Sequence, residues 1–306
     1  MRVVVIGIGG VGGYYGGKLA MRARHDEGLE VIFVARGRNL EQIQKKGLKL
    51  ITDEGEFVAH PTRAADNTEE AGTADLIIFC VKGYDLEESA RLVSRNLKKR
   101  TAVLPLLNGV NNAEKLKALL PGCKILNGCV YISTSIVEPG TVRQAGGSCQ
   151  LFFGPEDGNI DNFMEIERLF KDAGIKAELK TNIKEVVWEK YIFVCPMASV
   201  TSLLRQPFGA LMENEESRDL IEGLMREIEL IARAKDVGLA EDVVESSLKK
   251  ASAFPYDTKT SMQLDFEKAQ KTELEIFTGY VVKAGGELGI EVPLHQRVYS
   301  RLKADQ

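Results

Sequence analysis

The sequence is poor in the residues that build metal sites and disulfide frameworks. Its 306 residues include only three histidines, and these form no cluster with ligand spacing: His25, His60 and His295. The five cysteines are odd in number and share no Cys-x-x-Cys spacing, so we expect reduced and mostly buried thiols. These shortages argue against a metal site and against a disulfide scaffold.

Long apolar runs and an excess of basic residues are missing too. The longest unbroken apolar stretches, such as Leu76–Val81 and Tyr191–Ala198, are far shorter than the roughly 20 residues of a membrane span. Met1-Arg2 leads directly into Val3–Ile6, without the apolar region or cleavage site of a signal peptide. Lys and Arg number 40 against 44 Asp and Glu, a net charge of −4. We therefore expect a cytoplasmic protein with neither a membrane nor a nucleic acid as partner.

What remains is an ordinary globular composition, 44% hydrophobic and 27% charged, at a length that predicts two domains. In the first half, amphipathic helical patterns alternate with short apolar runs: Val3–Ile6, Val31–Ala35, Leu76–Val81, Val103–Leu107 and Ile125–Val130. Runs that are apolar on both faces are typical of a parallel sheet covered by helices. Residues 131–154 resemble antiparallel strands and turns. We expect an α/β fold, with residues 1–181 forming a Rossmann-type doubly wound domain.

The pattern changes after residue 181, where strand-like runs end. Helical periodicity covers 183–195, 215–237, 240–253 and 261–287. We therefore expect residues 182–306 to form a mostly α-helical domain. Its amphipathic C-terminal helices would suit pairing in a homodimer and would equally suit covering their own domain.

Seven of the 29 glycines lie between Gly7 and Gly17. Gly7, Gly9 and Gly12 fit the pattern GxGxxG directly after Val3–Ile6 and before a helical pattern. In dinucleotide-binding proteins the first glycine allows a tight turn, the second allows close approach of a pyrophosphate, and the third allows the helix to pack on the sheet. A tight packing turn is the alternative, but the flanking strand and helix favour dinucleotide binding.

The end of the second predicted strand indicates which dinucleotide is bound. NAD enzymes usually place Asp or Glu there to bind the ribose 2′-hydroxyl, whereas this chain has Arg36 and Arg38 and no acidic residue. The guanidinium of Arg36 would suit a 2′-phosphate, which favours NADP(H) as the cofactor. The alternative is that both arginines simply face solvent.

Two further polar residues follow predicted strands, where ligands bind in such sheets. Lys82 follows Leu76–Val81, and Asn108 with Gly109 follows Val103–Leu107. Either side chain would reach a nicotinamide or a substrate carboxylate. A solvated loop lysine and an ordinary turn asparagine are equally good interpretations of each residue alone.

Two charged residues lie in apolar helical patterns. Lys190 lies between Val187 and Val194, and Glu273 occupies a similar place in the predicted helix 261–287. A charge at such a place is costly unless it is paired. Hydride addition to a ketone creates an alkoxide, and the ammonium group of a lysine can donate the proton that this alkoxide needs. Glu273 would orient the lysine or accept a hydrogen bond from a substrate hydroxyl. A buried Lys190–Glu273 ion pair without chemistry is the structural alternative.

Several segments together resemble the ketopantoate reductase (2-dehydropantoate 2-reductase) family. They are GIGGVGGYYG at 7–16, VKGYD at 81–85, NG at 108–109, WEK at 188–190, and SMQLD with KTELE at 261–275. The glycine turn is common to many dehydrogenases, whereas the two C-terminal signatures in this order are much more specific.

The resemblance implies NADPH-dependent reduction of the small 2-keto acid 2-dehydropantoate to pantoate, on the route to pantothenate and coenzyme A. Lys190 then matches the general acid, and Glu273 matches the glutamate of the second signature. Ser261 matches a serine that binds the substrate carboxylate, while Asn108 and Lys82 match active-site residues of the cofactor domain. Gly7, Gly9, Gly12 and Arg36 match the NADPH site.

The chain departs from the family at one place. Members commonly carry asparagines four and eight residues after the lysine, where Val194 and Ala198 stand here. Each lost amide removes hydrogen bonds worth about 0.5–1.5 kcal/mol, for which Ser199 or Ser202 would partly compensate. Two rival hypotheses therefore stay open: an enzyme acting on a different 2-keto acid or 3-hydroxy acid, and a non-catalytic NADP(H)-binding regulator.

Overall fold

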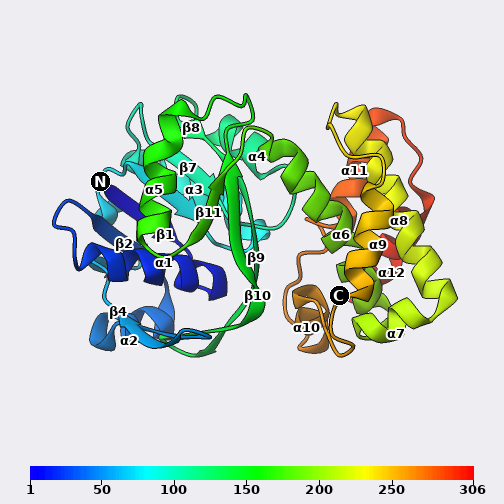
Figure 1. Cartoon of the computed structure of the whole chain (residues 1–306), viewed down its shortest axis with the longest axis horizontal. Coiled ribbons are helices and arrows are strands. Elements are labelled where there is room, and N and C mark those ends of the chain that lie inside the picture. Colours follow the sequence, from blue (N-terminus) through cyan, green and yellow to red (C-terminus); the bar gives the residue numbers. More distant parts are fainter. The chain divides into compact units, whose positions relative to one another are not determined.

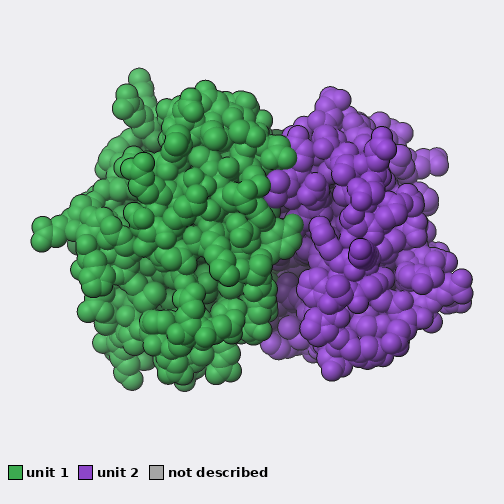
Figure 2. Space-filling view, viewed as in Figure 1, with its two compact units in different colours: residues 1–107, 111–183 green, residues 108–110, 184–306 purple. Residues whose placement is uncertain are grey.

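The computed structural model describes residues 1–306, with the side chain of Arg95 excepted. The chain divides into two compact units (Figure 2). We call residues 1–107 with 111–183 the sheet unit, and residues 108–110 with 184–306 the helical unit. The segment 108–110 thus belongs with the helices, although its neighbours in the chain belong with the sheet.

The sheet unit is built on a six-stranded parallel sheet (Figure 1). Its strands are β1 (Arg2–Ile6), β2 (Glu30–Val34), β5 (Arg63–Ala65), β6 (Leu76–Phe79), β7 (Ala102–Pro105) and β8 (Lys124–Ile125). Their spatial order, β5-β2-β1-β6-β7-β8, is the doubly wound order in which the winding reverses beside the first strand. The expected Rossmann-type fold is confirmed.

Both faces of this sheet are buried. Side chains alternate along a strand, so Val3 and Val5 of β1 enter one apolar core while Val4 and Ile6 enter another. Helices α1 (Gly10–Ala23), α2 (Gly37–Lys46) and α5 (Met164–Asp172) contribute to the first core, and α3 (Leu86–Leu92) and α4 (Asn112–Leu119) to the second. Four short 3-10 turns accompany them: η1 (Glu69–Ala71), η2 (Gly83–Asp85), η3 (Val93–Asn96) and η4 (Asp161–Phe163).

A second sheet contributes to the first of these cores. Its strands are β3 (Leu48–Thr52), β4 (Gly55–Ala59), β9 (Asn127–Glu138), β10 (Thr141–Gly154) and β11 (Lys176–Leu179). β9 and β10 form an antiparallel hairpin that turns at Gly140, which has a φ of +79°. This hairpin confirms the antiparallel pattern expected for residues 131–154, whereas the β3–β4 pair was not expected.

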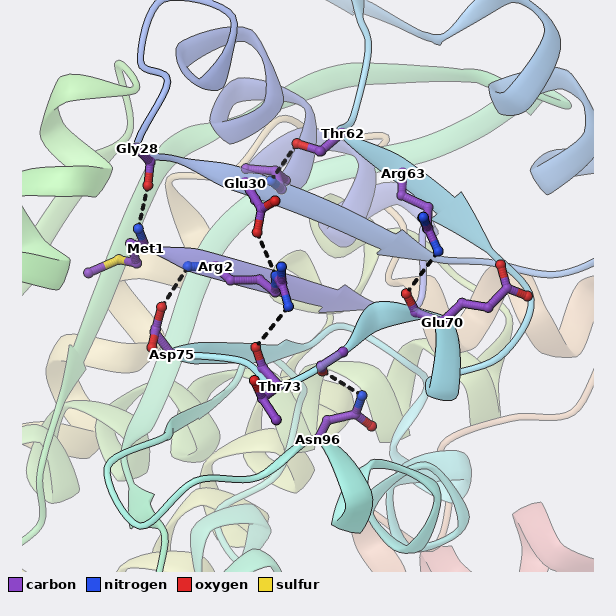
Figure 3. Close-up of polar contacts among 12 residues, drawn as sticks. Met1, Arg2, Gly28, Glu30, Thr62, Arg63, Glu70, Thr73, Asp75 and Asn96 are labelled. Carbon is purple, nitrogen blue, oxygen red and sulfur yellow. Dashed lines mark hydrogen bonds and ion pairs between the residues drawn. The ribbon is translucent and has the colours of Figure 1, made fainter.

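Polar contacts tie together the amino ends of the parallel strands (Figure 3). Arg2 Nε donates to Glu30 Oε2 at 2.6 Å, and the backbone N–H of Arg2 donates to Asp75 Oδ2 at 2.7 Å. Asn96 Nδ2 donates to the carbonyl of Gly72 at 2.7 Å. These contacts are structural, since ligands of such sheets bind at the opposite, carboxyl ends of the strands.

The helical unit confirms the mostly helical C-terminal domain (Figure 1). Its helices are α6 (Ile183–Leu204), α7 (Phe208–Glu213), α8 (Glu215–Ala234), α9 (Val243–Ser252), α10 (Ser261–Glu267), α11 (Thr278–Leu288) and α12 (Pro293–Ala304). α6 continues through Pro196, beyond the predicted end at residue 195. Proline removes one helical hydrogen bond, but the helix around it is buried, including Cys195, Met197 and Ala198.

Two predicted elements were wrong. The apolar run Ile125–Val130 is not one strand: β8 ends at Ile125 in the parallel sheet, and β9 begins at Asn127 in the second sheet. An apolar run reports burial but not which sheet a residue joins. The segment 261–287 is likewise not one helix, because α10 ends at Glu267 and α11 begins at Thr278.

In the part of the chain that the structure describes, no helix has the length and apolar character needed to cross a membrane.

Candidate functional site

The three fingerprint glycines occupy three different environments. Gly7 has a φ of +91°, and a Cβ there would lie 2.8 Å from Val81 Cγ1. A Cβ on Gly12 would lie 2.0 Å from the carbonyl oxygen of Gly7, so only glycine lets α1 start against the turn. A Cβ on Gly9 would meet no atom within 4 Å, which leaves its backbone open to approach. The first turn of α1 carries no acidic residue, so the positive end of the helix is available to an anion.

Two of the predicted cofactor residues lie at the carboxyl ends of the two parallel strands that flank β1. Arg36 precedes α2 directly after β2, and its side chain is exposed. Lys82 follows β6 at the start of η2, and it is half-buried. Because β1 lies between β2 and β6, both residues flank the glycine turn at the point where the winding of the sheet reverses.

In the helical unit, Asn108 lies between Lys190 and Glu273. Lys190 Nζ donates to Asn108 Oδ1 at 3.4 Å, and Asn108 Nδ2 donates to Glu273 Oε2 at 3.1 Å. The amide is therefore oriented by a cation on its oxygen side and a carboxylate on its nitrogen side. Only 5% of Glu273 is exposed, while Lys190 is half-buried. We call Asn108, Lys190 and Glu273 the polar triad.

Glu273 does not lie on a helix, which corrects its predicted placement on an apolar helical face. Ala269 adopts a φ of +50°, a left-handed conformation that ends α10. The N–H groups of Ala269 and Gln270 donate to the carbonyls of Phe266 and Asp265, which is the Schellman pattern of a helix C-terminus. Glu273 then begins a turn before α11, so its burial comes from tertiary packing.

Tyr191 is a residue of this region that the sequence did not single out. It follows Lys190 on α6, is 2% exposed, and its Oη donates to the carbonyls of Ile276 at 3.0 Å and Phe277 at 2.8 Å. Both carbonyls belong to the turn that Glu273 begins. Its only sequence signal is its position beside Lys190, because a tyrosine in an apolar helix normally indicates packing.

Ser261 is the exposed first residue of α10. The preceding Thr260 caps this helix, accepting a hydrogen bond from the N–H of Gln263 at 3.2 Å. Thr260 Oγ1 also lies 2.8 Å from Thr201 Oγ1 of α6. Thr201 stands eleven residues beyond Lys190, which is about 16 Å along a helix. The start of α10 therefore contacts the C-terminal half of α6, beyond Lys190.

The face of α6 beyond Lys190 is apolar. Val194 and Ala198 follow Lys190 at four-residue steps, so the three share one face of the helix. Ser199 Oγ donates to the Cys195 carbonyl at 2.7 Å, and Ser202 Oγ donates to the Ala198 carbonyl at 2.7 Å. Both serines are buried, and Ser199 Oγ also lies 2.7 Å from Thr278 Oγ1, so these contacts do not favour the suggestion that the serines replace the missing asparagines.

No group of histidine, cysteine, aspartate and glutamate side chains suited to a metal ion occurs among the described residues. The three histidines are separate, and His295 is fully buried against Glu227.

Comparison with known protein families shows to which family the chain belongs. A model of the ketopantoate reductase PanE/ApbA family matches residues 3–158, and the model of its C-terminal part, ketopantoate reductase PanE/ApbA C terminal, matches residues 182–306. The chain belongs to the ketopantoate reductase family. The chain therefore has the fold of an NAD(P)-dependent oxidoreductase, and it belongs to a family of oxidoreductases that act on small-molecule keto acids.

Two relatives of this ketopantoate reductase family member match along almost their full lengths. An uncharacterized oxidoreductase, YkpB of Bacillus subtilis, is 28% identical over 99% of this chain and 98% of its own. A 2-dehydropantoate 2-reductase of Halobacterium salinarum is 30% identical over 96% of this chain and 95% of its own.

Solved structures agree on the fold. The PanE/ApbA family ketopantoate reductase of Ralstonia eutropha superimposes with a TM-score of 0.90 at 30% identity, covering 100% of this chain and 98% of the other. A D-mandelate dehydrogenase, solved with NADH and anilino(oxo)acetate, shares the fold with a TM-score of 0.88 at 21% identity, covering 100% of this chain and 98% of its own.

Proposed function

We propose that this cytoplasmic member of the family reduces a 2-keto acid with NADPH. 2-Dehydropantoate is the first substrate to consider, and its product is (R)-pantoate, the precursor of pantothenate and coenzyme A. The observation that carries the proposal is the polar triad, in which a lysine and a nearly buried carboxylate meet on one amide. A reductase of a ketone needs such a proton donor at a defined place.

The sheet unit has residues that suit the cofactor. The open space at Gly9 is where a pyrophosphate would approach the N–H groups that begin α1. Arg36 is exposed beside it and carries the planar charge that suits a 2′-phosphate, so we infer NADPH in preference to NADH. When bound, the cofactor supplies a hydride to the keto carbon.

The chain's own groups supply the rest of the reaction. As the keto carbon accepts the hydride, the carbonyl π electrons move onto oxygen, and Lys190 Nζ transfers its proton there, which gives the 2-hydroxy acid. Water restores the proton to Lys190. Asn108 and Glu273 hold the ammonium group in place, and Ser261 and Lys82 are the residues that we assign to the substrate carboxylate.

A second candidate substrate follows from Val194 and Ala198. Neither side chain has a polar group, and Ala198 is buried, so the α6 face that continues from Lys190 offers no side-chain hydrogen bond to a hydroxylated acyl chain at these two positions. A 2-keto acid with an unsubstituted hydrocarbon chain would lose no hydrogen bond at Val194 and Ala198. This favours, as the alternative, an NADPH-dependent reductase of a different 2-keto acid.

Steady-state oxidation of NADPH tests the proposal, with 2-dehydropantoate beside pyruvate, 2-ketoisovalerate and phenylglyoxylate, and with NADH in a parallel series. The proposal predicts the highest kcat/KM for 2-dehydropantoate with NADPH. Preference for a hydrocarbon-chain acid establishes the alternative. Turnover of none of the acids, together with NADPH binding, indicates the non-catalytic regulator.

Substituting Arg36 tests the choice of cofactor. Arg36→Ala should weaken NADPH binding about 10- to 100-fold, since bonds between charged groups are worth about 1.5–3 kcal/mol, while NADH binding stays the same. Arg63→Ala, at the amino end of β5, is the matched control and should change neither. Equal loss of both cofactors in Arg36→Ala would contradict a 2′-phosphate contact.

A further inference from the structure

Tyr191 connects the helix that carries Lys190 to the turn that carries Glu273. Its Oη donates to the carbonyls of Ile276 and Phe277 at 3.0 and 2.8 Å. The N–H groups of the same two residues donate to the carbonyl of Glu273, at 2.9 and 3.1 Å. The Tyr191 hydroxyl therefore binds the two residues whose N–H groups close the turn onto the carbonyl of Glu273.

The ring of Tyr191 is fixed by its surroundings. It stacks on Phe277 with centroids 6.2 Å apart, and it meets Trp188 and Tyr280 edge-on at 5.9 and 6.0 Å. Burial raises the pKa of Tyr191 well above its ordinary value, so the hydroxyl remains a donor at every pH at which the enzyme works. Because the ring is held on several sides, the direction of its hydroxyl is fixed relative to α6.

The turn itself has little other regular structure to hold it. α10 ends at Glu267 and α11 begins at Thr278, so Glu273 lies in ten residues between two helices. A buried carboxylate that must meet Asn108 at 3.1 Å needs a defined backbone position. The hydrogen bonds of Tyr191 fix the backbone of this turn relative to α6. The neighbouring residue on α6, Lys190, contacts the same Asn108 side chain.

We propose that Tyr191 is a positioning residue of the reductase, which holds the Glu273 turn in register with Lys190 so that both meet Asn108. The proposal rests on the proposed function. It assigns to Tyr191 no contact with substrate or cofactor.

Tyr191→Phe is the test, because it keeps the ring and removes only the donor. We expect kcat to fall about 10- to 100-fold, the usual consequence of a small displacement in a catalytic site, with the KM for NADPH unchanged. The alkaline limb of the kcat–pH profile should move to lower pH, as in Glu273→Gln, because a displaced carboxylate no longer stabilises the ammonium group. Tyr299→Phe, which removes the hydroxyl that donates to Glu275 on the same segment, is the matched control and should keep wild-type kcat.

A double-mutant cycle separates positioning from general destabilisation. If Tyr191 acts through Glu273, adding Tyr191→Phe to Glu273→Gln should change kcat less than twofold. A full additional loss in that background, or a wild-type kcat and pH profile in Tyr191→Phe alone, would overturn the proposal.

Hydrogen exchange gives a readout that does not depend on turnover. The amides of Ile276 and Phe277 should exchange faster in Tyr191→Phe than in wild type or in Tyr299→Phe. Unchanged exchange would overturn the positioning role. If the wild-type chain reduces none of the acids while exchange behaves as expected, the proposed function fails and the structural link stands.

Discussion

The three glycines of the sheet unit that we assign to the cofactor are close in sequence, whereas the polar triad of the helical unit is assembled from distant segments. Gly7, Gly9 and Gly12 lie in one strand–turn–helix segment. Asn108, Lys190 and Glu273 are separated by 82 and 83 residues along the chain, and their contacts span up to 165 residues. A local site depends on backbone conformation that short-range sequence determines. A dispersed site depends on several packing contacts at once, so it should be sensitive to changes at many places.

The largest expected effect tests the dispersed site. Lys190→Ala should lower kcat about 10²- to 10⁴-fold, because the proton donor is lost, while NADPH binding measured by fluorescence titration stays nearly unchanged. Lys184→Ala on the same helix is the control, since its Nζ donates to the Lys235 carbonyl and not to the triad. Near-normal turnover in Lys190→Ala would end the proposed mechanism.

A pair of glycine substitutions tests the local site. Gly9→Ala adds a Cβ into open space, so the fold should keep its Tm, whereas NADPH should bind at least about tenfold more weakly. Gly12→Ala adds a Cβ 2.0 Å from the Gly7 carbonyl, so it should lower the free energy of unfolding by about 1–3 kcal/mol. Thermal melts and NADPH titrations of both variants measure this. Equal behaviour of the two would show that the glycines do not have separate roles.

Acid should destabilise the helical unit through a buried pair on α8 and α12. Glu227 accepts hydrogen bonds from the N–H groups of Leu294 and His295 and lies 2.7 Å from His295 Nδ1. Burial lowers the pKa of His295, whereas the hydrogen bonds from His295 and Leu294 lower the pKa of Glu227 despite its burial. The other two histidines, His25 and His60, are exposed in the sheet unit.

The sign of this dependence follows from proton binding. Below pH 6.5 the unfolded chain protonates histidine before the folded chain does, so stability falls as pH falls, by at most about 1.4 kcal/mol per pH unit for one proton. The stability that Glu227 contributes is present above pH 4.5 and is lost as the pH falls below that value. Urea unfolding followed by Trp188, the single tryptophan and part of the helical unit, measures this. His295→Gln should flatten the slope between pH 6.5 and 5, and an unchanged slope would contradict it.

The smallest expected effect tests where α10 ends. Ala269→Gly should raise stability by about 0.5–1 kcal/mol, because glycine adopts a φ of +50° without the steric cost of alanine. If residues 261–287 formed one helix, as their periodicity predicts, the same change would lower stability by about 1 kcal/mol. The sign of the change in urea midpoint therefore separates the two structures.

Much of the fold and part of the site were predictable from the sequence. Val3–Ile6 predicted a strand buried on both faces, and the glycine pattern after it predicted the turn into α1, because both signals are local and repeat with known periods. The helix expected over 261–287 failed, since its apolar periodicity continues across Ala269, where the backbone turns left-handed. The strand expected over Ile125–Val130 failed because periodicity does not say which sheet a strand joins.

The sequence alone determined the family, the doubly wound sheet, the helical C-terminal half and the identity of the charged residues in apolar surroundings. Only the tertiary structure decided that Asn108 stands between Lys190 and Glu273, that Glu273 lies in a turn, and that the Ser199 hydroxyl pairs with Thr278 of α11. The physical reason is that strands and helices arise from contacts a few residues apart, whereas the meeting of residues 108, 190 and 273 depends on packing that brings remote segments together. A charged residue in an apolar sequence pattern indicates that its side chain needs a polar partner, and the tertiary packing determines which residue that partner is.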